Sequence, residues 1–434
     1  MQLTRVTVMI SFVALLSGAT AAAQDSSNGQ QTAYSVVGLA TLGGTSGTGN
    51  TINDRNWPMG SANLAGNQSA HATIWLEGLT FDLGTLGGPN SGVEWPVKNN
   101  RGVISGIAET STANPLGESW SCSAFFPAVT GDICLGFRWQ NGAMTALPTL
   151  GGYDGYAAGV NNLGQIVGWA ETTVRDSTCV SPQVLQFEPV IWQPNNELRQ
   201  LPTFTGDPDG AATAINDQGD VVGISGTCDV AVGAFSAAHA LLWQKDKLTN
   251  LGSLGGVAWN TPTAMNNYGE VAGFSDLPGD ESGAPNFHAF LWTAQSGMQD
   301  LGTLPGDAYS EALDINDASQ IVGTSCTAGF ASCRAFLWQN GVMTDLNTLI
   351  PPDFALYLLV AGGISDQGVI TGQASDETTG DTPAFRALPT PGGETSLSQA
   401  SVSEGPRVAL PENVRQMLLR RLGVDNTLLR ARAR

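Results

Sequence analysis

The stretch Ile215-Asn216-Asp217-Gln218-Gly219-Asp220-Val221-Val222-Gly223 is the clearest copy of a motif that recurs seven times along the chain. Five other copies begin at Ile52, Val97, Val160, Met265 and Ile315, and a degenerate seventh begins at Ile364. Most copies are 46 to 62 residues apart. This spacing is typical of β-propellers, in which each blade is a four-stranded sheet of roughly 40 to 50 residues.

Two further motifs recur with the same frequency. One is clearest at His288-Ala289-Phe290-Leu291-Trp292, and its tryptophan returns as Trp75, Trp139, Trp192, Trp243 and Trp338. The seventh copy, Pro383-Ala384-Phe385-Arg386-Ala387, has lost the tryptophan. The other motif is Leu-Gly-Thr-Leu-Gly-Gly, clearest at Leu83 to Gly88. Three motifs in a fixed order indicate one structural unit repeated seven times.

These motifs carry a family resemblance that spans about residues 34–389. The chain resembles the bacterial extracellular HAF-repeat proteins, which are named for the motif seen here as His288-Ala289-Phe290. The resemblance implies an exported bacterial protein, and it supplies no activity.

Each unit is expected to contain four short strands. In the fourth unit these are Ala211 to Ile215, Asp220 to Ile224, Ala240 to Gln244 and Leu248 to Leu254, which are rich in apolar residues and bounded by turn residues. Asn-Asp-x-Gly suits the turn between the first two strands, because the side chains of Asn and Asp cap turns and Gly accepts a positive φ. A calcium site there is disfavoured, since one carboxylate per turn does not supply six oxygens.

The two ends of the chain complement each other. Tyr34 to Leu42 reads as a fourth strand with its following Gly-containing loop, whereas the seventh unit stops after its third strand near Leu388. A ring closed by both ends explains this offset and leaves no open sheet edge. The sequence therefore predicts an all-β, seven-bladed propeller over 34–389, closed by the N-terminal strand and followed by a short C-terminal helix.

The regions outside the propeller have their own signatures. Residues 1–23 read as a secretory signal peptide, with Arg5 before an apolar run and small residues at Ala21 to Ala23. Residues 24–33 are expected to be disordered, 390–410 to form a linker, and 411–434 to form a basic amphipathic helix. This helix suits either an anionic surface or docking onto the acidic propeller. No transmembrane segment is expected, and the location is extracellular or periplasmic.

The six cysteines all fall in the loops between second and third strands. Disulfides are the usual state of cysteines in exported proteins. The propeller arrangement favours the pairs Cys122–Cys134, Cys179–Cys228 and Cys326–Cys333, although spacing alone allows fifteen connectivities. We expect no metal site and no cofactor.

Charge and residue types narrow the function. A formal net charge of −20 disfavours nucleic acid as a partner. The only histidines, His71, His239 and His288, share one slot of the repeat, which indicates a structural role. No catalytic residues are predicted, and the expected chain is a monomer.

The loops that vary between units are the best place for a function. Candidate binding residues are the loop aromatics and their polar neighbours, namely Trp95, Tyr156, Asp207, Asp209, Trp259, Asn260 and Tyr309. Trp120 and Trp169 lie near the loops between second and third strands. Because Trp259 has no counterpart in other units, we expect an exposed ring and a cost below about 1 kcal/mol for Trp259→Ala.

The sequence thus favours a secreted, non-enzymatic binding or surface-interaction protein that recognises a glycan or a protein. A propeller polysaccharide hydrolase or lyase is the first alternative, and a carboxylate pair over the central channel would favour it. A structural cell-surface module is the second alternative, and flat loops without a pocket would favour that.

Overall fold

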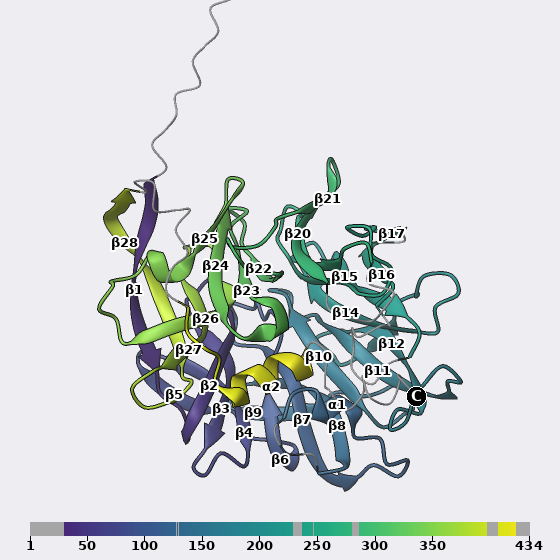
Figure 1. Ribbon diagram of the computed structural model, residues 1–434. Coiled ribbons are helices and arrows are strands. Elements are labelled where there is room, and N and C mark those ends of the chain that lie inside the picture. Colours follow the sequence, from purple (N-terminus) through teal and green to yellow (C-terminus); the bar gives the residue numbers. More distant parts are fainter. Residues whose placement is uncertain are drawn as a thin grey trace, which may run out of the picture.

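The computed structural model describes residues 30–126, 128, 130–228, 237–245, 247–279, 286–396 and 407–421. Its strands form seven antiparallel sheets of four strands each, which follow one another around the molecule in chain order (Figure 1). The predicted fold, an all-β propeller with seven blades, is therefore confirmed. The predicted signal peptide lies outside the described residues.

Within each blade the strands are paired in chain order. Blade 1 contains β2 (Gly43–Ile52), β3 (Pro58–Leu64), β4 (Ala70–Leu76) and β5 (Leu79–Asp82). Blade 2 contains β6 (Gly87–Gly92), β7 (Ile104–Ala113), β8 (Asp132–Gln140) and β9 (Ala143–Ala146). Blade 3 contains β10 (Gly155–Val160), β11 (Ile166–Arg175), β12 (Leu185–Trp192) and β13 (Leu198–Gln200). Blade 4 contains β14 (Asp209–Ile215), β15 (Val221–Gly226), β16 (His239–Gln244) and β17 (Lys247–Asn250).

The remaining blades repeat this plan. Blade 5 contains β18 (Asn260–Met265), β19 (Val271–Asp276), β20 (Phe287–Thr293) and β21 (Gly297–Asp300). Blade 6 contains β22 (Tyr309–Ile315), β23 (Ile321–Cys326), β24 (Cys333–Gln339) and β25 (Val342–Asp345). Blade 7 contains β26 (Leu356–Ile364), β27 (Ile370–Asp376), β28 (Ala384–Ser396) and β1 (Gln30–Leu39). The short helices are α1 (Trp120–Ser123), η2 (Ala328–Phe330), η3 (Leu346–Thr348) and α2 (Glu412–Arg421).

The ring closes through blade 7, as predicted. Strand β1 pairs antiparallel with β28, so the N-terminal strand supplies the outer strand that the last unit lacks (Figure 1). The pairing is longer than the sequence indicated: it starts at Gln30, which lies opposite Ser396. Residues 30–33 and 390–396 are therefore strand, although the sequence suggested disorder and a linker.

The Asn-Asp-x-Gly turns join neighbouring blades as well as neighbouring strands. The Oδ1 of Asn216 accepts hydrogen bonds from the backbone N–H groups of Gln218 and Asp220, and its Nδ2 donates to the carbonyl of Asn266 in the next blade. The same bond to the next blade is made by Asn53, Asn99, Asn161, Asn266 and Asn316. The interpretation of the motif as a turn is confirmed, and the first Asn also ties the ring together.

The second residue of each turn forms a further ring of hydrogen bonds. The backbone N–H of each residue donates to the side chain of its successor, and the last bond runs 3.0 Å from Asp366 back to Asp54. The members are Asp54, Asn100, Asn162, Asp217, Asn267, Asp317 and Asp366. This turn face of the propeller is consequently built from side chains that are already paired.

Blade 2 departs from the predicted register of the motif. Asn99 makes the turn, so Lys98 rather than Val97 occupies the slot that Ile215 fills in blade 4. The Lys98 ammonium reaches the buried Asp314 carboxylate and the carbonyl of Ile364. A charged side chain is accepted there because a carboxylate from blade 6 pairs with it.

The repeated His and Trp side chains are structural, as predicted. The Nδ1 atoms of His71 and His288 lie 2.9 Å from Asp82 and Asp300, and His239 pairs with Asp207. The indole N–H groups of Trp75, Trp192 and Trp243 donate to backbone carbonyls of the connections between blades. The three indoles, and His239 through Asp207, therefore fasten their blades to the segments that lead into them. His71 and His288 instead pair with the last residue of the outer strand of their own blade.

All three predicted disulfides are present: Cys122–Cys134, Cys179–Cys228 and Cys326–Cys333. The first and third each close one loop, whereas the second joins the loops of blades 3 and 4. Three disulfides are consistent with an oxidising location.

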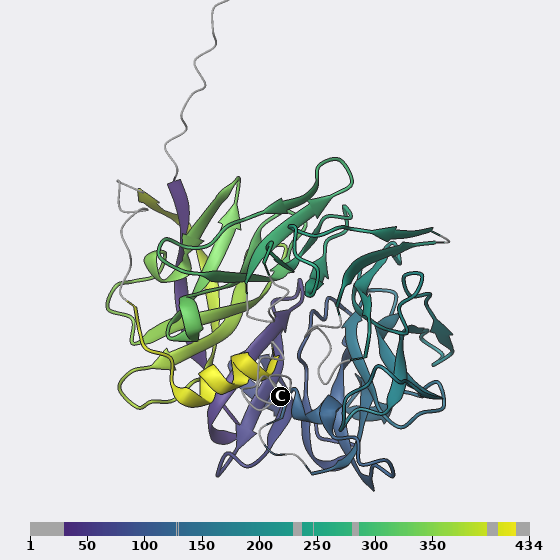
Figure 2. The same ribbon diagram turned by 45° about the vertical axis from the view of Figure 1, so that its right-hand side comes forward.

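Helix α2 docks onto the loop face of the propeller (Figure 2). Val414 and Leu419 are buried in the same apolar cluster as Phe330 and Leu359. The Arg415 side chain donates to the carbonyl of Gly329, and the backbone N–H of Leu410 donates to Ala331. Of the two roles suggested by the sequence, docking onto the propeller is the one observed. No helix among the described residues is both long and apolar enough to cross a membrane.

Candidate functional site

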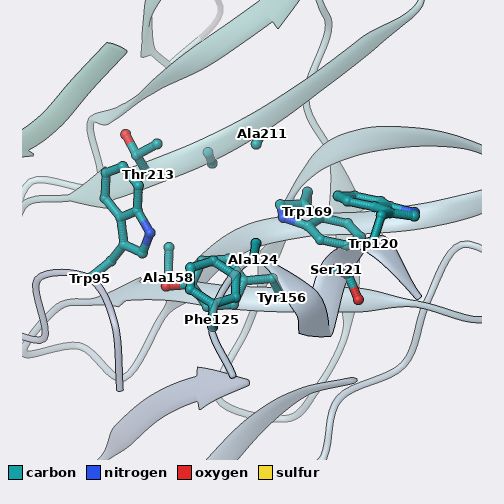
Figure 3. A pocket seen from close by; sticks show the side chains of 11 residues that line it. Trp95, Trp120, Ser121, Ala124, Phe125, Tyr156, Ala158, Trp169, Ala211 and Thr213 are labelled. Atoms are coloured by element: carbon teal, nitrogen blue, oxygen red, sulfur yellow. The ribbon is translucent and has the colours of Figure 1, made fainter. Parts of the chain in front are cut away.

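A pocket of about 510 Å³ opens on the loop face, between the inner strands of blades 2, 3 and 4 (Figure 3). Five aromatic residues dominate its lining: Trp95, Trp120, Phe125, Tyr156 and Trp169. Small and hydroxyl side chains complete it: Ser121, Ala124, Ala158, Ala211, Ala212 and Thr213. A concave, mostly apolar surface with a few polar groups is the usual form of a small-ligand site.

Different parts of the chain supply the aromatic rings. Tyr156 and Trp169 lie on β10 and β11 of blade 3, and Trp95 follows the inner strand β6. Trp120 belongs to α1, which sits in the long loop of blade 2. Phe125 comes two residues after α1 and packs against Tyr156. The aromatic wall of the pocket is therefore formed by the inner strands of blade 3 together with the long loop of blade 2.

The rings hold one another in place. Trp120 stacks on Trp169 with centroids 4.7 Å apart and planes 20° apart. Phe125 stacks on Tyr156 at 5.1 Å and 24°. Phe187 lies behind the tryptophan pair, 5.5 Å from Trp169. Such stacking makes the walls rigid, so the pocket exists before any ligand arrives.

The pocket wall also carries an unused hydrogen-bond donor. The indole nitrogen of Trp169 is buried and has no hydrogen-bond partner among the described residues. Figure 3 shows this nitrogen on the side of the ring that faces Trp95 and Tyr156. A buried donor without a partner is costly, but this nitrogen is enclosed by the wall and a ligand does not reach it unless the rings move.

The sequence candidates divide into three groups. Trp95, which is half-buried, and Tyr156, which is buried, line this pocket. Tyr309 lines a smaller pocket of about 210 Å³ with Phe287 and Phe330. The other four candidates lie in neither pocket. Trp120, Phe125 and Trp169 complete the aromatic wall, although the sequence did not place them among the binding residues.

The polar candidates support the backbone. Asp207 accepts hydrogen bonds from His239 and Ser225, and the Asp209 carboxylate accepts one from the backbone N–H of Phe187. Asn260 is buried and bonds to Ser275 and to the carbonyl of Ala238. Asp207, Asp209 and Asn260 are therefore engaged in holding loops to strands.

The prediction of an exposed Trp259 is wrong. Its side chain is 6% exposed and packs edge-on against Phe274 and Phe287, each with a centroid distance of 5.2 Å. The ring fills the layer beneath the loops of blade 5. Trp259 is thus a core residue, and it is removed from the candidates for ligand contact.

Asp209 gives a prediction about pH. Burial raises its pKa to about 8, and the neighbouring Asp176 carboxyl adds to the rise. The unfolded chain has an ordinary carboxyl pKa of about 3.9, so only the native state keeps this proton at intermediate pH. The resulting stability is fully present below about pH 4 and is lost as the pH rises through about 8.

Asp209→Asn should therefore make the free energy of unfolding less dependent on pH between about 4 and 8. The amide retains the acceptor for the Phe187 N–H and has no charge to bury. Denaturant unfolding of both proteins across this pH range measures the difference. If the free energy of unfolding changed equally with pH in the wild type and the variant, the raised pKa of Asp209 would be contradicted.

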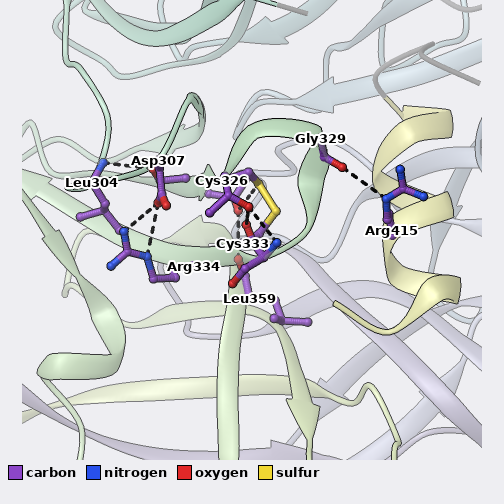
Figure 4. The surroundings of a disulfide bond; sticks show 12 residues. Leu304, Asp307, Cys326, Gly329, Cys333, Arg334, Leu359 and Arg415 are labelled. Carbon is purple, nitrogen blue, oxygen red and sulfur yellow. Dashed lines mark hydrogen bonds and ion pairs between the residues drawn. A yellow bond between two sulfur atoms is a disulfide. The ribbon is translucent and has the colours of Figure 1, made fainter. Parts of the chain in front are cut away.

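A buried ionic network joins the C-terminal segment to blade 6, and Figure 4 shows its Arg334–Asp307 pair. Arg334, which occupies the His slot of this blade, is 2% exposed and pairs with Asp307 at 2.8 Å and Asp345 at 3.3 Å. Arg407, which precedes α2, lies 3.5 Å from the other oxygen of Asp307. The network lies beside the Cys326–Cys333 disulfide and fixes the segment that leads to the docked helix.

Comparisons with known proteins identify no relative and find only distant structural similarities. No protein-family model matches the chain, and no curated protein matches it in sequence. Among solved structures, virginiamycin B lyase from Staphylococcus aureus is 10% identical, with a TM-score of 0.46, covering 83% of this chain and 100% of the lyase. A streptogramin B lyase is 13% identical, with a TM-score of 0.46 and coverages of 82% and 98%.

The acylaminoacyl peptidase of Pyrococcus horikoshii is 10% identical, with a TM-score of 0.42 and a coverage of 79% of this chain. The present chain spans only 50% of that peptidase. Similarities at this level carry no function from those enzymes to this protein. The molecule is a seven-bladed β-propeller with an aromatic pocket on its loop face.

Proposed function

We propose that this protein is a non-enzymatic binding protein that takes a saccharide ring into the aromatic pocket on its loop face. The observation that supports this most strongly is the convergence of five aromatic side chains around one preformed pocket. Aromatic faces bury the flat apolar face of a ring, and the half-buried rings of Trp95 and Phe125 offer such faces at this pocket.

The chemistry of the lining favours binding over hydrolysis. Glycoside hydrolysis generally uses a pair of carboxyl groups that flank the bond to be cleaved. The described residues that line this pocket include neither Asp, Glu nor His. The hydroxyls of Ser121, Tyr156 and Thr213 are the reactive groups in the lining, and Thr213 already donates to the carbonyl of Pro262.

The proposal also covers the origin and the location of the protein. The HAF-like motif and the signal-peptide pattern support an exported bacterial protein, located in the periplasm or outside the cell. The three disulfides are in keeping with this location. A protein in this location would meet saccharides that are displayed on a cell surface or released from one.

A glycan array tests the proposal. The labelled wild-type protein should bind a defined set of immobilised saccharides. Trp95→Ala should weaken that binding by about 30-fold or more, because loss of a tryptophan that is a main ligand contact typically costs about 2 kcal/mol or more. Trp95 is half-buried at the pocket edge, so the variant should remain folded.

Tyr268→Ala is the matched control, since this aromatic side chain is 76% exposed and belongs to a turn on the opposite face. It should bind like the wild type. The proposal fails if no saccharide is retained by the wild type, or if Trp95→Ala and Tyr268→Ala bind equally well.

A further inference from the structure

Three buried carboxylates meet beside the pocket, behind its walls. Glu118, Asp154 and Glu171 are each no more than 1% exposed, and one oxygen from each lies within 4.8 Å of the other two. They come from the long loop of blade 2, the entry to β10 and strand β11. Among the described residues, none of the three forms an ion pair with Lys or Arg.

The local hydrogen bonds leave one open oxygen on each glutamate. The backbone N–H groups of Val184 and Leu185 both donate to Oε1 of Glu118. Those of Tyr153 and Asp154 both donate to Oε2 of Glu171. Oε2 of Glu118 and Oε1 of Glu171 are buried and have no partner among the described residues.

Blade 2 shows how the repeat otherwise fills these positions. Asn90 and Glu109 occupy the slots that Asp154 and Glu171 fill in blade 3. There the Asn90 amide donates to Glu109 at 2.7 Å, and Thr130 donates to the other Glu109 oxygen. Blade 3 has a second carboxylate in place of the amide, and Glu118 adds a third.

The electrostatics of the blade 3 cluster are unfavourable without a cation. One oxygen of each buried carboxyl lies within 4.8 Å of the other two, so burial and mutual repulsion both oppose ionisation of the three groups. Yet five backbone N–H groups point at the cluster, counting Cys134, which donates to Asp154. Such donors favour the ionised form of a carboxyl. Backbone N–H groups that favour ionised carboxyls, together with carboxylate oxygens that have no hydrogen-bond partner, are features of a cation site.

We propose that Glu118, Asp154 and Glu171 bind a divalent cation of the calcium type. All three donors are oxygens, which suit Ca²⁺, Mg²⁺ or Mn²⁺. Calcium is preferred because it accepts oxygen ligands in irregular geometry, whereas magnesium demands a near-ideal octahedron. This site is separate from the Asn-Asp turns, where the sequence argued against calcium.

The position of the cation gives it a structural role in the pocket. Glu118 is two residues before Trp120, and Glu171 is two residues after Trp169. The ion would tie the loop of blade 2 to blade 3 immediately behind the two stacked indoles. This inference does not depend on the identity of the pocket ligand.

Calcium titration of the purified, chelator-treated protein tests the proposal. Millimolar calcium chloride should raise the melting temperature of the wild type by several degrees, and magnesium chloride should raise it less. Terbium should show luminescence sensitised by nearby tryptophan. Asp154→Asn should abolish both responses without unfolding the protein, because it recreates the Asn–Glu pair of blade 2.

Glu109→Gln is the matched control, since it changes a buried glutamate in the same slot whose oxygens both have partners. It should keep the calcium response and the terbium signal. The proposal is overturned if the wild type shows neither response, or if Asp154→Asn retains them. A magnesium response equal to that of calcium would overturn the assignment to calcium.

Discussion

Deletion of residues 34–42 is expected to leave a chain that aggregates or does not fold cooperatively. The deletion removes most of β1, including the buried side chains of Tyr34, Val36 and Leu39. Burial of each is worth about 1.5 to 3 kcal/mol, and a domain is stable by only about 5 to 15 kcal/mol. The loss also exposes β28 as an unpaired edge, which is a template for association between chains.

Thermal unfolding and size-exclusion chromatography of the deletion protein measure this effect. Val37→Ser is a suitable control, because this side chain of the same strand is 44% exposed. It should change the free energy of unfolding by about 0.5 kcal/mol or less. A deletion protein that remains monomeric and melts like the full chain would contradict closure by β1.

Trp259→Ala is expected to destabilise the protein by roughly 3 to 5 kcal/mol, the usual cost of removing a large aromatic ring from a core. The ring is enclosed by Phe274 and Phe287, so its loss leaves a cavity that neighbouring loops cannot easily fill. Chemical denaturation at equilibrium gives the difference in the free energy of unfolding.

The exposed Tyr268 provides the comparison, since Tyr268→Ala removes an aromatic ring from the surface of the same blade. That variant should remain within about 0.5 kcal/mol of the wild type. A cost below about 1 kcal/mol for Trp259→Ala would mean that the ring is not part of the core.

The seven-bladed architecture could be predicted from the sequence because each blade of a propeller uses the same motif residues for the same contacts. The Asn of the turns and the Trp of the third strand contact equivalent segments in successive blades. One copy therefore informs the others, and the displaced N-terminal strand reveals the closure. The disulfide pairs followed once the loops were assigned to one face.

The core beneath the loops could not be predicted in the same way. Different blades use side chains from different segments of the chain to fill the corresponding part of this core. Blade 5 packs Phe274 and Phe287 against Trp259 from its own entry loop. Blade 3 packs Trp169 and Phe187 against Trp120, which comes from the long loop of blade 2. A tryptophan without a counterpart in other repeats is therefore not necessarily exposed.

For the same reason, the sequence predicted only some of the aromatic residues that line the pocket. Trp95 and Tyr156 stood out as loop aromatics, but their convergence with Phe125 depends on how the blade 2 loop folds over blade 3. Asp154 and Glu171 occupy repeat slots of blade 3, and Glu118 joins them only through that loop. Long-range contacts of this kind leave no periodic signal.

A cross-link between the two ends of the ring tests the central structural claim most directly. Ser35 on β1 lies opposite Leu388 on β28. Paired residues of antiparallel strands have Cα atoms about 4.5 to 5.5 Å apart, within the range that a disulfide spans. The variant Ser35→Cys/Leu388→Cys is compared with Thr145→Cys/Leu388→Cys, in which the first cysteine lies on the outer strand of blade 2.

Mass spectrometry of non-reduced digests identifies the bond after mild oxidation of the folded monomer. The closed propeller predicts a disulfide between positions 35 and 388 and none between positions 145 and 388. Folded Ser35→Cys/Leu388→Cys protein in which both new thiols stay free and reactive would contradict a ring closed by β1.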